Sequence, residues 1–264
     1  MNGAGPAGVP HATLITVGLV LATMMNSLDI TICNVALPHM QGSVSASSDQ
    51  ITWVLTSYIV AVAIMTPLTG WLAGQFGRRM VLRTSILCFI GASVLCGIST
   101  TLTELVAFRM IQGLSGAALV PITQAILLDI NPPERHGQAM AALGTGAVIG
   151  PIMGPFLGGF LTEHLNWRWV FFINIPIGLA AFVGISFLQK RGFRDRAKFD
   201  FLGYAFIALA VGLFQLMLDR GQQQDWFDSW EIRIELMLAI MFAAMFVVQM
   251  KLAEHRFIDL ALFA

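Results

Sequence analysis

Long apolar stretches alternate with short polar segments along the chain. Each apolar stretch approaches the ~20 residues that an α-helix needs to cross the hydrocarbon core of a bilayer. The pattern predicts eight membrane-spanning helices, at residues 12–37, 51–73, 81–99, 104–128, 138–161, 169–188, 201–218 and 232–250. We therefore expect an all-α polytopic membrane protein.

The composition supports this class of protein. Hydrophobic residues make up 56% of the chain and charged residues only 11%, whereas soluble domains carry about 25% charged residues. The 15 basic and 15 acidic residues cancel, so no net attraction to nucleic acid is expected. The three cysteines are odd in number and all lie in apolar stretches. We interpret them as small core residues and not as a disulfide framework.

The basic residues predict the orientation in the membrane, because short cytoplasmic loops are enriched in Lys and Arg. With eight spans, one side of the membrane receives Arg78, Arg79, Arg83, Arg135, Lys190, Arg191, Arg194, Arg196, Lys198, Lys251 and Arg256, and the other side receives only Arg168, Arg220 and Arg233. An odd number of spans would destroy this asymmetry. Both termini are therefore expected to be cytoplasmic.

Motifs of soluble enzymes are missing from the sequence. The three lysines follow no glycine-rich phosphate loop, and the five histidines lie on separate segments without metal-ligand spacing. We expect no ATP site, no metal, no cofactor and no enzymatic activity. Energy for any transport would have to come from an ion gradient.

Two charged residues lie inside predicted spans, Asp29 in the first and Arg109 in the fourth. Both lie roughly 7 to 11 Å below the outer surface, at ~1.5 Å of helix rise per residue, so they can pair. One interpretation is a buried ion pair that only fixes helix packing. The other, favoured because charges inside spans are costly, is a functional site. Asp29 or its neighbourhood would take up a proton or a cationic substrate, and the positive charge of Arg109 would modulate that uptake.

Four amide side chains occur in the same two spans. They are expected to add hydrogen-bonding walls to the same interior, although each taken alone is more typical of a contact that holds two helices together. They are Asn26, Asn34, Gln112 and Gln124.

Glycines recur every four residues in the fifth predicted span, interleaved with prolines: Gly146, Gly150, Pro151, Gly154, Pro155, Gly158 and the adjacent Gly159. A repeat of four places glycines on one ridge of a helix, where no side chain keeps a neighbouring helix away. Each proline removes a backbone N–H. The stretch therefore predicts a bent, closely packed helix whose freed carbonyls are sheltered by neighbouring helices.

Five stretches between residues 28 and 178 follow one another in a characteristic order: LDITICNVALP at 28–38, GWLAGQFGRR at 70–79, LVAFRMIQG at 105–113, GAVIGPIMGPFLGG at 146–159 and WRWVFFINIPIG at 167–178. In sequence and order they resemble the motifs of the fourteen-helix drug:proton antiporters of the major facilitator superfamily. The resemblance implies the N-terminal six-helix half of a major facilitator fold plus an inserted two-helix hairpin. We expect a cytoplasmic tail at 1–11, the six-helix half at 12–190, a basic linker at 191–200, the hairpin at 201–250 and a lead-in to a second half at 251–264.

The resemblance also implies roles for individual residues. Asp29 and Arg109 are the candidates for proton coupling. The conformational motifs are the glycine–proline stretch of the fifth span and the loop residues Gly70, Gly74, Gly77, Arg78 and Arg79. Gly74 stands where the family usually has an acidic residue, so a charge contact expected to hold one conformation closed is either missing or supplied elsewhere.

These features predict a proton-coupled efflux transporter of lipophilic or amphiphilic compounds in a bacterial cytoplasmic (inner) membrane. In a two-membrane bacterium, the resemblance implies a periplasmic adaptor and an outer-membrane channel as partners. The alternatives are a non-transporting assembly or regulatory module and, less favoured, an eight-helix channel.

The second six-helix half of the family is missing, so we expect a fragment, a truncated reading frame or a chain that must pair with another. The glycine ridge is expected to pack largely on that missing half. The chain alone is therefore expected to insert but not to transport.

Overall fold

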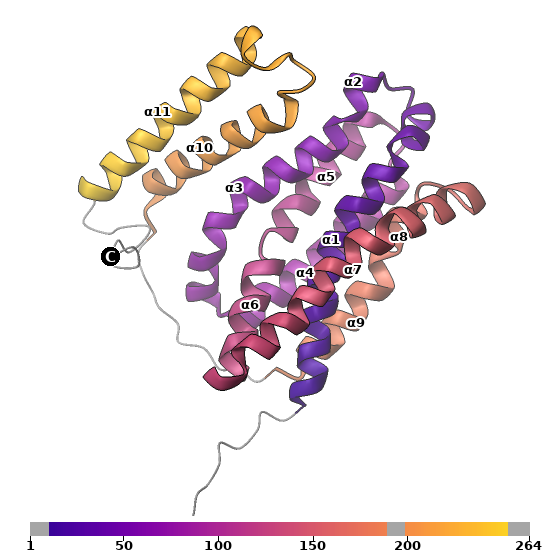
Figure 1. Cartoon of the computed structure of the whole chain (residues 1–264), viewed down its shortest axis with the longest axis vertical. Helices are drawn as coiled ribbons and strands as arrows, with labels where there is room; N and C mark the ends of the chain where they lie inside the picture. Colours follow the sequence, from indigo (N-terminus) through magenta and orange to yellow (C-terminus); the bar gives the residue numbers. More distant parts are fainter. Residues whose placement is uncertain (1–10, 189–198, 253–264) are drawn as a thin grey trace, which may run out of the picture.

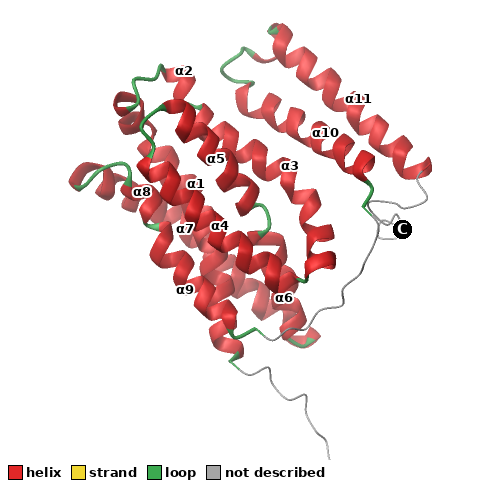
Figure 2. Ribbon diagram, turned by 180° about the vertical axis from the view of Figure 1, so that it is seen from behind, coloured by secondary structure: helices red, strands yellow, loops and turns green. Residues whose placement is uncertain are grey.

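The computed structural model describes residues 11–188 and 199–252. All regular structure in these two ranges is helical (Figures 1 and 2). The α-helices are α1 (Ala12–Ser43), α2 (Ser48–Ile51), α3 (Trp53–Phe76), α4 (Arg78–Ile98), α5 (Leu102–Gly116), α6 (Leu119–Ile130), α7 (His136–His164), α8 (Trp169–Phe172), α9 (Asn174–Ser186), α10 (Phe201–Arg220) and α11 (Trp230–Leu252). Short 3-10 turns lie at η1 (Pro133–Arg135) and η2 (Trp226–Asp228).

Within the described residues, seven helical segments are long and apolar enough to cross a membrane, which confirms the all-α, multi-pass class. Several of them join consecutive helices; the fourth, for example, combines α5 and α6 over Leu102–Ile130. The eighth expected span coincides with α11, a helix of 23 residues that is not among the seven, so the count of eight stays a prediction. Most of the expected tail, basic linker and C-terminal lead-in lies outside the described residues.

Helix boundaries follow local chemistry. Thr101 and Glu104 form a capping box at the start of α5, satisfying backbone N–H groups that a helix start leaves free. Gly77 joins α3 to α4 at a φ of +87°, a backbone conformation that favours glycine. The first span was expected to end at Pro38, but α1 continues through it to Ser43. A proline removes one helical hydrogen bond without always ending the helix, particularly in a membrane span.

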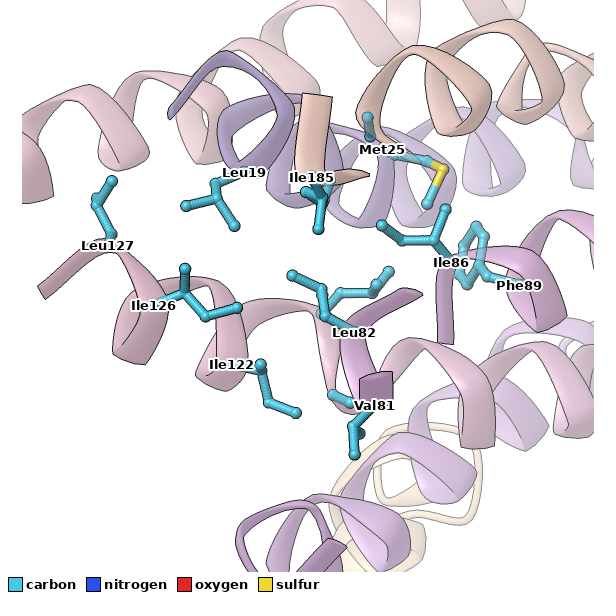
Figure 3. Packing of buried hydrophobic residues seen from close by; sticks show 14 of the residues in the cluster. Leu19, Met25, Val81, Leu82, Ile86, Phe89, Ile122, Ile126, Leu127 and Ile185 are labelled. Atoms are coloured by element: carbon cyan, nitrogen blue, oxygen red, sulfur yellow. The ribbon is translucent and has the colours of Figure 1, made fainter. Parts of the chain in front are cut away.

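Helix α1 runs through the middle of the six-span bundle and packs against α7, α9 and α6, while α3 and α4 pack against α5 (Figures 1 and 2). Two apolar clusters fill the interior. One uses the N-terminal half of α1, from Ile15 to Met25, together with residues of α4, α6 and α9 (Figure 3). The other uses α1 from Ile32 to Met40. Asp29 therefore lies between the two apolar clusters.

Helices α10 and α11 form a hairpin outside this bundle, and α10 lies along α3 (Figure 1). Close approach and polar contacts join the two helices. A Cβ added at Gly212 would lie 2.8 Å from Cγ1 of Ile64, and the Tyr204 hydroxyl donates to the Ile64 carbonyl at 3.3 Å. At the other end of α10, Thr56 donates to the Asp219 carboxylate.

The glycine ridge of α7 packs on α1. A Cβ added at Gly146 would lie 2.8 Å from the carbonyl oxygen of Val20. The hydroxyls of Ser27 and Thr31 donate to the carbonyls of Gly146 and Gly150 at 3.4 and 3.3 Å. Both bonds join residues 119 positions apart, so the two helices run parallel.

The expectation that this ridge packs largely on the missing second half is therefore wrong. Gly154 and Gly158 continue the contact, approaching Thr31 and Ile32 of α1. The ridge finds its partner inside the same half because α1 presents the short Ser27 and Thr31 side chains at a matching spacing of four residues. The opposite face of α7 is exposed and apolar, with Ile152 at 66% and Phe156 at 68% exposure.

Candidate functional site

An ion pair between Asp29 of α1 and Arg109 of α5 lies in the middle of the bundle. Arg109 Nη1 approaches Asp29 Oδ2 at 2.6 Å, and the two side chains are 0% and 1% exposed. The two residues thus pair as their depths in the spans suggested. In a water-excluded interior such a pair requires further hydrogen bonds to offset the loss of hydration.

Two neutral amides supply those bonds to the carboxylate. Gln112 Nε2 and Asn174 Nδ2 both donate to Asp29 Oδ1, at 2.9 and 2.7 Å. Gln112 Oε1 accepts from Arg109 Nη1 at 2.8 Å, so this amide bridges both members of the ion pair. The carboxylate is therefore shared between one cation and two uncharged donors.

The guanidinium of Arg109 is held on its other sides by α3 and α8. Its Nε donates to the carbonyl of Val54 at 3.1 Å. Its Cζ lies 4.2 Å from the ring centroid of Tyr58 and 5.8 Å from that of Phe171. Aromatic faces attract a cation most strongly where water is excluded, so the charge of Arg109 is stabilised on several sides.

A second layer of polar groups surrounds this core. Asn26 Nδ2 donates to the Tyr58 hydroxyl at 2.9 Å. Asn174 Nδ2 also reaches Ser93 Oγ at 3.0 Å, and Ser93 Oγ donates to the carbonyl of Phe171 at 2.8 Å. The network therefore extends from the ion pair into α3, α4 and the broken sixth span.

The local sequence explains how these groups converge. Arg109 and Gln112 are three residues apart on α5, which places them on one face of the helix. The close approach of α3 depends on Gly113, where an added Cβ would collide with the Tyr58 carbonyl. The step between α8 and α9 at Ile173 places Asn174 at the first residue of α9.

The four predicted amides separate into two groups. Gln112 is buried in the cluster, and Asn26 reaches its second layer through Tyr58. Asn34 on α1 and Gln124 on α6 are exposed on the surface of the bundle. A shared interior for all four is therefore not what the structure shows, and a cavity role for Asn34 and Gln124 remains a prediction.

The loop motif at 70–79 makes a separate set of contacts. Arg78 forms an ion pair with Asp129 at the end of α6. The loop has no acidic residue at Gly74, but the Asp129 carboxylate contacts the loop from another helix. Arg79 Nη2 donates to the carbonyl of Ser186 at 2.8 Å, which ties the loop to the end of α9. Gly70 is exposed on α3.

Three residues of the cluster were not singled out from the sequence: Asn174, Ser93 and Tyr58. Asn174 carried a usable signal, because it is an amide in a predicted span and part of the fifth motif. Ser93 carried no signal beyond being a small polar residue. In the part of the chain that the structure describes, no group of three His, Cys, Asp or Glu residues is placed to hold a metal ion.

The chain matches known proteins in sequence over nearly its whole length. Residues 19–258 match the family model described as Major Facilitator Superfamily. The chain is 42% identical over 254 residues to the "Multidrug export protein EmrB" of Haemophilus influenzae, covering 95% of this chain and 49% of that protein. It is 38% identical over 251 residues to the "Fatty acid resistance protein FarB" of Neisseria gonorrhoeae, covering 94% and 50%. The chain thus spans about half the length of the curated relatives it matches.

Solved structures show the same fold at low sequence identity. The proton:xylose symporter XylE aligns with a TM-score of 0.63 at 12% identity, over 93% of this chain and 55% of that one. A bacterial homologue of the lysosomal transporter Spinster aligns with a TM-score of 0.59 at 18% identity, over 90% and 60%. At these identities the likeness establishes the arrangement of helices.

Proposed function

The chain belongs to the major facilitator superfamily, and on this premise we propose that it forms the N-terminal half of a proton-coupled exporter of lipophilic or amphiphilic compounds. The proposed location is a bacterial cytoplasmic membrane, with both termini in the cytoplasm. In a two-membrane bacterium, the partners would be a periplasmic adaptor and an outer-membrane channel. The names of the curated relatives, which are multidrug export and fatty acid resistance proteins, support this substrate class.

The buried pair of Asp29 and Arg109 carries the proposal. Asp29 is the carboxylate at the centre of the bundle, and its charge is balanced by Arg109 at 2.6 Å. A proton that binds Asp29 removes the negative charge and leaves Arg109 without its counterion, a costly state in a water-excluded interior. Proton uptake therefore changes the forces between α1 and α5. This is the type of bistable element that a proton-driven cycle requires.

The exposed amides support a second half beside this one. Asn34 and Gln124 lie within spans but face outward from the bundle. A polar side chain facing lipid is unfavourable, so such residues usually face a cavity or another helix. Alternating access in this class of protein is a rocking of two halves about a site near the midplane. We propose that Asn34 and Gln124 line that cavity.

The test is efflux of ethidium from vesicles driven by an imposed pH gradient, using the full-length transporter that carries this half. Asp29→Asn keeps the size of the side chain but removes its proton-binding carboxylate, so gradient-driven efflux should be lost. Asp225→Asn is the matched control, since this exposed residue of the hairpin turn undergoes the same chemical change. Efflux that persists in Asp29→Asn at a normal amount in the membrane would contradict Asp29 as the coupling residue. Absence of efflux from the unmodified full-length transporter would instead favour a non-transporting module.

A further inference from the structure

Asn174 is a buried amide that contacts the Asp29 carboxylate from the sixth span. Its side chain is fully buried at the start of α9, immediately after the step that separates α8 from α9. Its Nδ2 faces Asp29 Oδ1 at 2.7 Å and Ser93 Oγ at 3.0 Å. Because an ionised carboxylate only accepts hydrogen bonds, the NH₂ end of the amide must face Asp29.

The oxygen of this amide can accept a new hydrogen bond. Asn174 Oδ1 is buried and, among the described residues, has no hydrogen-bond partner. Gln112 differs, because its Oε1 already accepts from Arg109 Nη1 at 2.8 Å and lies 3.6 Å from Cys96 Sγ. Of the two amides on the carboxylate, only Asn174 can therefore turn over without breaking a bond at its oxygen.

We propose that Asn174 is a positioning residue whose hydrogen bonds change when Asp29 is protonated, so that protonation on α1 affects the sixth span. This inference rests on the proposed function. While Arg109 holds Oδ2, an arriving proton binds Asp29 Oδ1, which faces two N–H donors. A rotated Asn174 amide presents its oxygen to the new O–H group and removes the clash between donors. No other proton changes its heavy atom in this step.

The rotation passes on to α8 through Ser93. With its oxygen turned inward, Asn174 no longer donates to Ser93 Oγ, and the Ser93 hydroxyl can rotate to donate to the Asn174 oxygen. The carbonyl of Phe171, which accepts from Ser93 at 2.8 Å, then loses that donor. Protonation of a residue on α1 thereby loosens the contact between α4 and α8.

Other titratable groups lie around the same carboxylate. They are Arg109 on α5, Tyr58 on α3, Cys33 on α1 and Cys96 on α4, each of which interacts electrostatically with Asp29. Asn174 itself does not titrate. A change in the pH dependence of transport after its substitution therefore reports on the hydrogen bond to Asp29.

The experiment measures ethidium efflux by the full-length transporter as a function of pH. Asn174→Leu removes a donor that stabilises the ionised carboxylate, so Asp29 should bind its proton more readily. The pH of half-maximal efflux should move upward by about one unit. Ser93→Ala removes only the last step, so the pH midpoint should stay while the maximal rate changes. Gln223→Leu, at an exposed amide position of the hairpin turn, is the control and should behave as the unmodified protein.

An unmoved midpoint in Asn174→Leu, at a normal amount in the membrane, would overturn the inference. If that variant is not recovered, Asn174→Ser is used instead; it should shift the midpoint in the same direction by less, and an unmoved midpoint there is equally contradictory. The two proposals fail separately. Efflux that survives Asp29→Asn contradicts the coupling site, whereas loss in Asp29→Asn with an unmoved midpoint in Asn174→Leu contradicts only the role of Asn174.

Discussion

The six-span bundle and the α10–α11 hairpin each contain an arginine paired with acidic residues, in very different surroundings. In the bundle, Arg109 and Asp29 are 0% and 1% exposed. In the hairpin, Arg220 of α10 pairs with Glu231 and Glu235 of α11 at 2.9 and 3.1 Å, and these three side chains are 20%, 62% and 11% exposed. The same type of ion pair is therefore fully buried in the bundle and partly exposed in the hairpin.

The two regions also differ in what joins their helices. In the bundle, helices meet backbone to backbone at glycines, and the ion pair connects α1 with α5 and, through Asn174, with α9. The hairpin meets α3 through side chains: Gly212 faces the Ile64 side chain, and Arg220 lies 5.5 Å from the ring of Trp53. Contacts between backbones cannot adjust by changing a rotamer, so the bundle should tolerate less change than the hairpin.

The largest difference is expected when each arginine is removed. Arg109→Ala leaves the Asp29 carboxylate buried without its counterion and should reduce the free energy of unfolding by about 3–5 kcal/mol. Arg220→Ala acts on a partly solvated cluster, where the loss should be about 1 kcal/mol. Denaturation of the purified protein in mixed micelles, followed by tryptophan fluorescence, measures both. Equal losses for the two variants would show that enclosure does not set the strength of these pairs.

A double variant sharpens this result. Asp29→Asn combined with Arg109→Gln leaves no isolated charge, so it should be more stable than Arg109→Ala alone. If it is not, the loss in the single variant comes from the packing of Arg109 against Tyr58 and not from the stranded carboxylate.

The second comparison adds one methyl group to each region. A Cβ at Gly150 of α7 would lie 2.7 Å from the backbone nitrogen of Leu28, so Gly150→Ala should destabilise the protein by about 1–3 kcal/mol. A Cβ at Gly212 of α10 would meet only the side chain of Ile64, which can change its rotamer. Gly212→Ala should therefore be nearly neutral, since alanine also gains up to about 1 kcal/mol of helix propensity.

Gly159 provides the control for the methyl group itself. It lies on α7 beside the ridge, and a Cβ there would meet nothing within 4 Å in the described part of the chain. Gly159→Ala should raise the free energy of unfolding by about 0.5–1 kcal/mol. Thermal unfolding that falls equally in Gly150→Ala and Gly159→Ala would contradict the packing of the ridge on α1.

The membrane spans and the depths of Asp29 and Arg109 could be predicted because both depend only on the number of residues along the chain. Hydropathy placed the helices, and helix rise placed Asp29 level with Arg109. The angular positions of residues around the helix axis also follow from the sequence. At ~100° per residue, Asn26 lies about 60° from Asp29 around α1, whereas Asn34 lies about 140° away. This angular difference distinguishes the half-buried Asn26 from the exposed Asn34.

Other features could not be predicted from helix rise and rotation. Gln124 lies fifteen residues from Arg109, which returns to within about 60° on an unbroken helix. Gln124 is nevertheless exposed on α6, beyond the interruption of the helix at residues 117–118, so its angle to Arg109 does not predict its burial. Asn174 is the first residue of α9, directly after Ile173, and no periodicity indicates that its amide meets Asp29. The glycine ridge showed that a helix must approach closely but not which one, because the answer depends on small side chains of α1.

The smallest predicted effects concern the side-chain contacts that hold the hairpin to α3. Thr56→Val removes the hydrogen bond to Asp219, and Tyr204→Phe removes the bond from the Tyr204 hydroxyl to Ile64; each should cost about 1 kcal/mol or less. The two contacts lie at opposite ends of α10, so their effects should add in the double variant. Hydrogen–deuterium exchange should become faster in α10 while α1 and α7 are unchanged, because the bundle has its own glycine and ion-pair contacts. Faster exchange throughout the chain would instead mean that the hairpin and the bundle unfold as one unit, and the comparison between the two regions would no longer hold.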